Sequence, residues 1–168
     1  MARVLALATV CLLAAGLCST AGQGLFGAPL SAEDARATPL RPGSPTAVVK
    51  PFYEHVGLEL DPAQRSHFVD PAKSVLDKSD ALRKSGQGEC LDPNMALDNA
   101  AYDRAEIDNS LKTVEAVKGD EAKVVVAFIV AGNPHRLEWK FKKVDGDWKI
   151  SDLLSVTGEW ALSQYQCE

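Results

Sequence analysis

The chain has few of the residues and none of the short motifs that carry most enzyme chemistry. It contains only three histidines, and none stands in a zinc-binding spacing such as H-E-x-x-H: His55, His67 and His135. The sequence also lacks G-x-S-x-G, S-x-x-K and a glycine-rich phosphate loop. The sequence therefore offers no motif for zinc chemistry, for nucleophilic serine or cysteine catalysis or for nucleotide binding, and we predict no metal and no cofactor.

The sequence also lacks a basic cluster. Its formal net charge is −5 over 168 residues. An acidic balance without a basic cluster argues against nucleic acid and against an anionic membrane surface as partners. The apolar fraction of 46% and the charged fraction of 24% are those of an ordinary globular protein.

Only the first segment is apolar enough to interact with a membrane. A short positive start at Arg3 precedes an apolar run from Val4 to Leu17 and small residues up to Ala21. This pattern predicts a signal peptide over residues 1–21, cleaved near Ala21, and an exported chain that is periplasmic or secreted. The alternative is a lipoprotein acylated at Cys18, which is disfavoured because Leu17, not a small residue, precedes that cysteine.

Two of the four cysteines remain after such cleavage. Cys90 and Cys167 are predicted to form a disulfide, since paired cysteines are usual in exported proteins. The alternative is two free thiols. A bridge would restrict the unfolded chain by about 4 kcal/mol in the chain-entropy model and would hold the C-terminus against the middle of the chain.

The segment from Lys123 to Leu154 predicts three consecutive antiparallel strands. Residues 123–131 form a β-branched, apolar run, and residues 137–142 alternate apolar with charged side chains. Asp145-Gly146 is a strong hairpin signal, because both turn positions need a positive φ. The alternation predicts one apolar face for the meander, made of Trp139, Phe141, Trp148 and Ile150.

Helices are predicted before the strands. Ser44-Pro45 begins an apolar stripe, although Pro51 inside it predicts a bend or a later start. Asp61-Pro62 and Asp70-Pro71 each predict a capped short helix, the second ending near Gly86. Residues 87–109 are polar and acidic and give no clear prediction of conformation, and residues 111–117 predict a further strand.

This order predicts an α+β fold with helices packed on one face of an antiparallel sheet. We predict a signal peptide over residues 1–21, a flexible segment over residues 22–43 and a single α+β domain over residues 44–168. There is no internal repeat and no sign of a second domain.

Four segments carry a resemblance to known proteins: Ala47-Val-Val-Lys-Pro-Phe-Tyr53, Cys90-Leu-Asp-Pro93, the strand ending Val124 to Val130, and Trp148-Lys-Ile-Ser-Asp-Leu153 followed by Trp160-Ala-Leu162. On these, residues 45–163 resemble a bacterial exported family described as domain of unknown function 3828. The order of elements also resembles the nuclear transport factor 2-like cone, which ketosteroid isomerases share. The resemblance implies N-terminal helices on a curved antiparallel sheet and an exported location, but no activity.

Clustered acids offer one possible cation site. They are Asp92, Asp98, Asp103 and Asp108. Hard cations favour clustered carboxylates, but a calcium loop starting at Asp98 would need oxygen ligands where Ala100 and Tyr102 stand. Solvated loop acids are the favoured interpretation.

One set of side chains could line a pocket inside such a cone: Tyr53, Tyr102, Trp139, Phe141, Trp148 and Asp152. By strand alternation, Asp152 is expected to point to the same side as Trp148 and Ile150, where it could act as a base with Tyr53 as hydrogen-bond donor. The alternative is that the aromatic side chains fill the core and Asp152 lies at a strand end near solvent.

Three functions follow. The first is a non-catalytic exported module that binds a small molecule or an envelope protein. The second is a small-pocket isomerase or dehydratase that uses Asp152 and Tyr53. The third is a protein inhibitor of a secreted enzyme, which suits a small, acidic, disulfide-closed domain.

Overall fold

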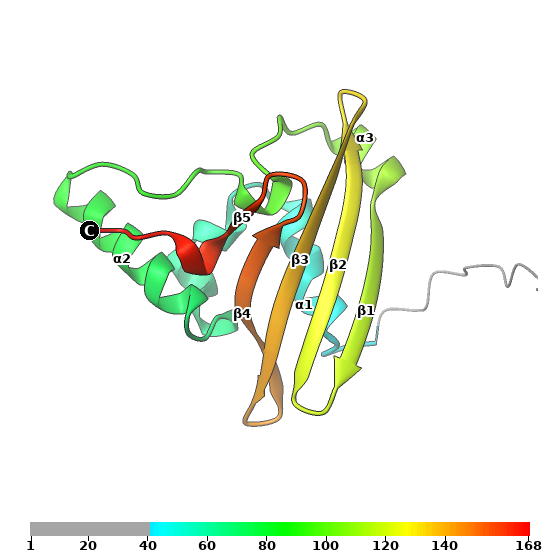
Figure 1. Ribbon diagram of the computed structural model, residues 1–168, viewed down its shortest axis with the longest axis horizontal. Coiled ribbons are helices and arrows are strands. Elements are labelled where there is room, and N and C mark those ends of the chain that lie inside the picture. The colour runs from blue at the N-terminus through cyan, green and yellow to red at the C-terminus, as the bar shows by residue number, and fades with distance from the viewer. Residues whose placement is uncertain (1–40) are drawn as a thin grey trace, which may run out of the picture. The chain divides into compact units, whose positions relative to one another are not determined.

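The sheet is a five-stranded antiparallel meander in which each strand pairs with the next one along the chain (Figure 1). The computed structural model describes residues 41–168, so the predicted signal peptide and residues 22–40 lie outside the described range. The strands are β1 (Lys112–Lys118), β2 (Glu121–Val130), β3 (Asn133–Val144), β4 (Asp147–Ser155) and β5 (Trp160–Ala161). The three predicted strands and the strand predicted at residues 111–117 are confirmed.

Two-residue loops connect the first four strands. Asp145-Gly146 joins β3 to β4 with φ values of 52° and 90°, as a hairpin turn with two left-handed positions requires. The loop between β2 and β3 is Ala131-Gly132, because Asn133 pairs with Val130. Pro134 therefore lies within β3, directly after its first residue.

Helix α1 (Pro45–Glu54) begins where the sequence predicts. The Ser44 hydroxyl accepts a hydrogen bond from the Ala47 amide, and Pro45 occupies the first turn, where its missing N–H costs nothing. The helix runs through Pro51, so the later start is wrong. Its buried residues include Val49, Phe52 and Tyr53.

The segment between α1 and the sheet contains two further helices. Asp61 caps a 3₁₀ segment over Pro62–His67 by accepting a hydrogen bond from the Ala63 amide. Helix α2 (Ala72–Ser85) ends at Gly86 in the left-handed conformation, as predicted. Helix α3 (Arg104–Ser110) lies largely in the region whose conformation could not be predicted clearly from the sequence.

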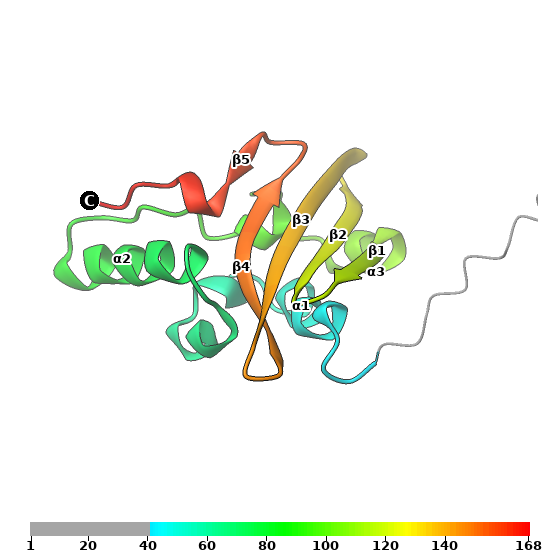
Figure 2. The same ribbon diagram turned by 60° about the horizontal axis from the view of Figure 1, so that its bottom comes forward.

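Burial alternates along β2 because the sheet has one covered face. Val124, Val126 and Phe128 are buried against the helices, while the intervening residues are partly or fully exposed. Helices α1 and α2 lie on the same side of the sheet (Figure 2). We call this the inner face and the opposite one the outer face. The predicted class, α+β with N-terminal helices on an antiparallel sheet, is confirmed.

The two edges of the sheet differ. The β4 edge is covered by β5 and, further along, by a bridge between Phe68 and Ile150. β1 forms the other edge, and all seven of its residues are exposed. Within residues 41–168, no helix is both long and apolar enough to cross a bilayer.

Candidate functional site

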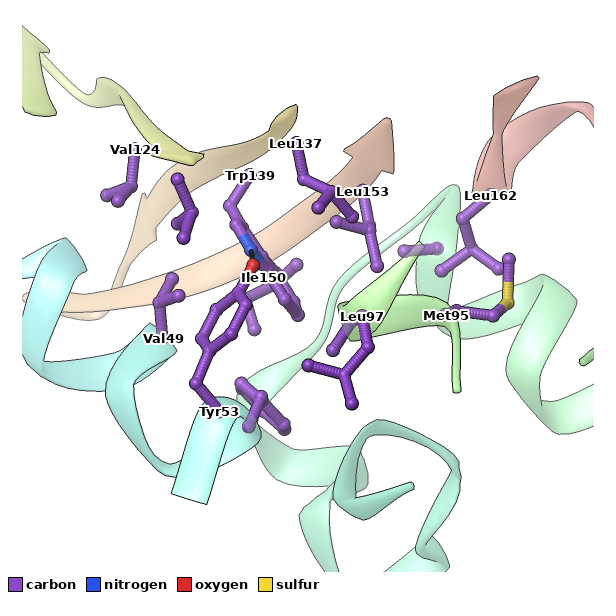
Figure 3. Close-up of a cluster of buried hydrophobic side chains, with 14 of the residues drawn as sticks. Val49, Tyr53, Met95, Leu97, Val124, Leu137, Trp139, Ile150, Leu153 and Leu162 are labelled. Carbon is purple, nitrogen blue, oxygen red and sulfur yellow. Dashed lines mark hydrogen bonds between the residues drawn. The ribbon is translucent and has the colours of Figure 1, made fainter. Parts of the chain in front are cut away.

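The interior that could have formed a ligand pocket is filled by its own aromatic side chains. Trp139 is fully buried and stacks on Phe52, with ring centroids 5.1 Å apart. The Trp139 Nε1 donates a hydrogen bond of 2.9 Å to the Tyr53 hydroxyl, which reaches across from α1 (Figure 3). Phe141 is also buried, and Trp148 packs at the margin of this core.

Tyr53 has the burial of a core residue rather than of a catalytic donor. Burial raises the pKa of its phenol, which therefore stays neutral over the physiological range. Its oxygen accepts the only polar hydrogen of Trp139. Trp148 differs, because Lys143 Nζ lies 5.5 Å from the centre of its indole at the sheet margin. A ligand between α1 and the sheet would have to separate these rings.

Asp152 does not point where strand alternation predicts. Phe141 pairs with Ile150, but Lys140 pairs with Asp152, so β4 has a bulge at Ser151. The extra residue inverts the alternation, and Leu153 rather than Asp152 shares the inner face with Ile150. The predicted orientation of Asp152 is therefore wrong.

The Asp152 carboxylate is used to hold the C-terminal segment. It accepts hydrogen bonds from the Ser163 amide at 3.0 Å and the Ser163 hydroxyl at 2.8 Å, and it is only 7% exposed. These bonds hold the 3₁₀ turn Leu162–Gln164 against β4. The structure therefore separates Asp152 from Tyr53, which lies under the inner face.

The four acids predicted as an alternative cation site have four different structural roles. Asp92 accepts a hydrogen bond from Asn99, Asp103 caps α3 through the Glu106 amide, and Asp108 pairs with Arg104. Among the described residues, no group of three or more His, Cys, Asp and Glu side chains could hold a metal. Tyr102, in the same region, is 40% exposed.

Asp98 joins three segments at one end of the sheet. Its carboxylate accepts hydrogen bonds from Trp160 Nε1 at 3.0 Å and from Thr157 Oγ1 at 2.8 Å, and lies 3.1 Å from His135 Nδ1. Burial alone would raise the pKa of Asp98, but these bonds and one from Ser155 outweigh it and hold the pKa below its usual range. The cluster fixes the β4–β5 turn against β3.

The Asp98 cluster also explains why residue 158 is a glycine. A Cβ on Gly158 would lie 2.9 Å from Asp98 Oδ1 and 2.9 Å from two atoms of the Trp160 indole. Only glycine leaves room for the turn to bring Trp160 onto the carboxylate. The sequence shows no motif for this arrangement, because its members are spread over residues 98–160.

The predicted disulfide is confirmed. Cys90 and Cys167 are bonded, with Cα atoms 5.5 Å apart. The bond ties the C-terminus to the loop that follows α2. Together with the Asp152 and Asp98 contacts, it fixes the segment after β4 at three places.

The outer face of the sheet is the exposed functional candidate. No described element packs over the outer side of β1, β2 and β3, and the helices lie on the opposite side (Figure 2). The strand pairing places valine and isoleucine side chains next to basic ones on this face. Its exposed apolar residues are Val114, Ile129, Val144 and Val156.

The outer face is positively charged although the chain is acidic. The strand register assigns it seven basic and four acidic residues: Lys112, Lys118, Lys123, Arg136, Lys140, Lys142 and Lys149, with Glu121, Glu138, Asp147 and Asp152. Glu138 is paired with Lys123 at 3.0 Å, and Asp152 is buried under Ser163. Among the described residues, Arg136, Lys140 and Lys142 make no ion pair.

The comparisons with known proteins give one structural likeness. No family model matches the chain, and no curated protein matches it, so the resemblance to domain of unknown function 3828 stays a prediction. The chain is similar to a chain in the crystal structure of the type VI native effector-immunity complex Tae3-Tai3 from Ralstonia pickettii, with a TM-score of 0.46 and 19% identity. The match covers 74% of this chain and 99% of that one.

Proposed function

We propose that the chain is an exported, non-catalytic protein-binding module that inhibits an enzyme by docking its outer sheet face onto it. The observation that carries the proposal is the uncovered, positively charged outer face on a chain of net charge −5. A patch opposite in sign to the rest of the molecule favours one orientation of approach to an acidic partner and speeds encounter.

The composition of the face supports a protein as the partner. Val114 is 67% exposed and lies across the sheet from half-buried Val125, so apolar area is available beside the lysines. Protein interfaces combine a desolvated apolar centre with a charged rim. The face is also held rigid by backbone pairing, which lowers the entropy lost on binding.

The interior gives a small-molecule ligand little room. A depression of about 180 Å³ lies beside α1, lined by residues that include Val48, Pro51 and His67. Sites for small molecules usually have about 300–1,000 Å³ and enclose most of the ligand. The packed core and this small depression favour a protein partner over a metabolite.

The location proposed for this activity is the periplasm or the cell exterior. The Cys90–Cys167 bond is consistent with an oxidising compartment, and the predicted signal peptide over residues 1–21 supplies the route. An effector handled by an immunity protein, as in the solved complex named above, is one partner to test.

The proposal is tested by capture and inhibition. The chain starting at residue 22 is immobilised with its disulfide formed, and envelope proteins of the source cell are passed over it. The face variant R136E/K142E is compared with the control variant K78E/K84E, which makes the same charge change on exposed lysines of α2. Captured proteins are purified and their enzymatic activities titrated with the chain.

We expect wild type and the control variant to retain the same protein and the face variant to lose it. The enzymatic activity of the captured protein should fall to near zero at one equivalent of the wild-type chain. Equal capture by the face variant would contradict the role of the outer face. Capture without loss of activity would leave a binding module but remove the inhibitor.

A further inference from the structure

We propose that the open edge of β1 takes up a β-strand from the partner, and that the ends of this strand carry acidic side chains facing Lys112 and Lys118. The inference rests on the proposed function, because it says how the inhibited protein binds. It adds a backbone contact that continues the sheet to the charge contacts of the outer face.

β1 is regular along its whole length. Its seven residues pair with β2 in one unshifted register, from Lys112 opposite Ala127 to Lys118 opposite Glu121. Nothing in the described part of the chain pairs with its other side, and it forms the margin of the sheet farthest from α2 (Figure 1). Every second residue therefore presents a free backbone N–H and C=O.

The chain covers its other sheet edge with further segments, whereas within residues 41–168 no segment pairs with this one. Proteins usually block exposed edges with proline, a bulge, a very short strand, a covering segment or charged side chains. The β4 edge has the two-residue strand β5, the bulge at Ser151 and the Phe68 bridge. Of these devices β1 has only charged side chains, Lys112, Glu115 and Lys118, which disfavour a strand of like charge but not one of opposite charge, and Val114 and Val117 are 67% and 52% exposed on its two faces.

The charges on β1 determine which strand would fit. Glu115 is occupied on the inner side, where it accepts hydrogen bonds from the Thr46 amide at 2.9 Å and the Thr46 hydroxyl at 2.6 Å. Lys112 and Lys118, one at each end, have no ionic partner among residues 41–168. A strand with an acidic residue near each end would complement them.

A second copy of the chain fits this edge poorly. Antiparallel pairing of all seven residues with β1 of another copy would place Lys112 opposite Lys118 at both ends and Glu115 opposite Glu115 in the middle. Like charges directly opposite each other destabilise a strand pair. The charges therefore favour a different protein as the donor of the strand.

The test uses the same envelope extract with variants of the edge. K112E/K118E reverses the two terminal charges. Thr113→Pro and Val114→Pro each remove one backbone amide donor. Successive amides of β1 point alternately to β2 and to the open side, so only one of the two variants loses a hydrogen bond to β2. The variant whose stability stays close to that of wild type is therefore the one altered on the open side. K78E/K84E is the charge control. Hydrogen exchange of residues 112–118 is measured for the free chain and for the captured complex.

We expect the edge proline and K112E/K118E to weaken capture by about tenfold or more, the loss of one or two charge-assisted or backbone contacts. Alternate amides of β1 should exchange fast in the free monomer and slowly in the complex. If both variants capture the partner as well as wild type does and the β1 amides stay unprotected in the complex, the proposal of a partner strand on β1 is contradicted. In that case, loss of capture by R136E/K142E would still support the proposed function.

Two results with the free chain would also overturn it. A stable dimer that protects the β1 amides would mean that a second copy occupies the edge. Protection in the free monomer would mean that the chain's own residues, including those before residue 41, already cover it. Capture of nothing by wild type would remove the proposed function and this inference together.

Discussion

At the scale of single residues, the Tyr53–Trp139 hydrogen bond gives the sharpest test of the packed interior. The Trp139 side chain has one polar hydrogen, and the Tyr53 hydroxyl accepts it in a site closed to solvent. Tyr53→Phe should lower the free energy of unfolding by about 2 kcal/mol, because the buried indole N–H loses its partner. Urea unfolding followed by tryptophan fluorescence measures the change.

The control is the same substitution without the indole donor. In a W139F background, Tyr53→Phe should cost clearly less, since no donor is left unpaired. Equal costs in the two backgrounds would mean that the hydrogen bond does not contribute to stability. Solvent access to the Trp139 side chain in the folded wild-type protein would instead support the pocket that the sequence suggested.

Glu59 is a second buried residue with a measurable consequence. It is 2% exposed, its Oε1 accepts a hydrogen bond from the Ala96 amide, and its Oε2 has no partner among the described residues. Burial raises the pKa of Glu59, against the opposing effect of the backbone hydrogen bonds. The folded protein therefore binds this proton more tightly than the unfolded chain does.

The pH dependence follows from that direction. The contribution of Glu59 is fully favourable below its ordinary pKa of 4.5 and is lost as the pH rises through the higher pKa of the folded state. The free energy of unfolding of Glu59→Gln should match that of wild type near pH 4. Above the raised pKa of Glu59 in the folded state, the variant should be more stable than wild type. Urea unfolding across this pH range checks it, with exposed Glu89→Gln as control. A wild-type advantage at high pH would contradict the assignment.

The face of the sheet on which a side chain lies could be predicted from the sequence for some residues and not for others. The inward side of Trp139 and Phe141 could be predicted, because alternation in β3 is unbroken. Asp152 could not, because one bulged residue in β4 inverts the phase and no sequence signal marks it. The Asp98 cluster also escaped prediction, since its members meet only in the folded chain.

At the scale of elements, the C-terminal segment depends on the disulfide. Cys90 and Cys167 are 77 residues apart, so the bond closes a long loop. The double variant C90S/C167S should lose about 4 kcal/mol of unfolding free energy, mainly because its unfolded chain is less restricted. Denaturant unfolding with and without reductant measures it. Equal midpoints for the oxidised and reduced proteins would contradict this role.

Helix α3 shows what a closer use of local signals could have added. Asp103 caps the helix through the Glu106 amide, and the spacing of an acceptor followed three residues later by Glu is a helix-start signature. The helix was missed because residues 87–109 are polar overall and have no apolar period. Only Ile107 of this helix is buried, so periodicity could not have revealed it.

At the scale of the whole molecule, the outer face of the sheet differs in charge from the rest of the described chain. Residues 41–111, which form the helices, contain 12 acidic and 8 basic residues, whereas the outer face of the sheet contains more basic residues than acidic ones. The net charge alone argued for no basic surface. Strand alternation hides one, because basic residues spaced two apart gather on a single face only once the strands are paired.

The most direct test of the central claim is lysine footprinting of the chain in the envelope extract. Acetylation rates are compared with and without the extract for Lys140 and Lys142 on the outer face and for Lys78 and Lys84 on α2. The account predicts that labelling of the outer-face lysines slows several-fold while labelling of the α2 lysines is unchanged, and that added salt removes the difference. Protection of the α2 lysines with free labelling of the outer face would contradict it.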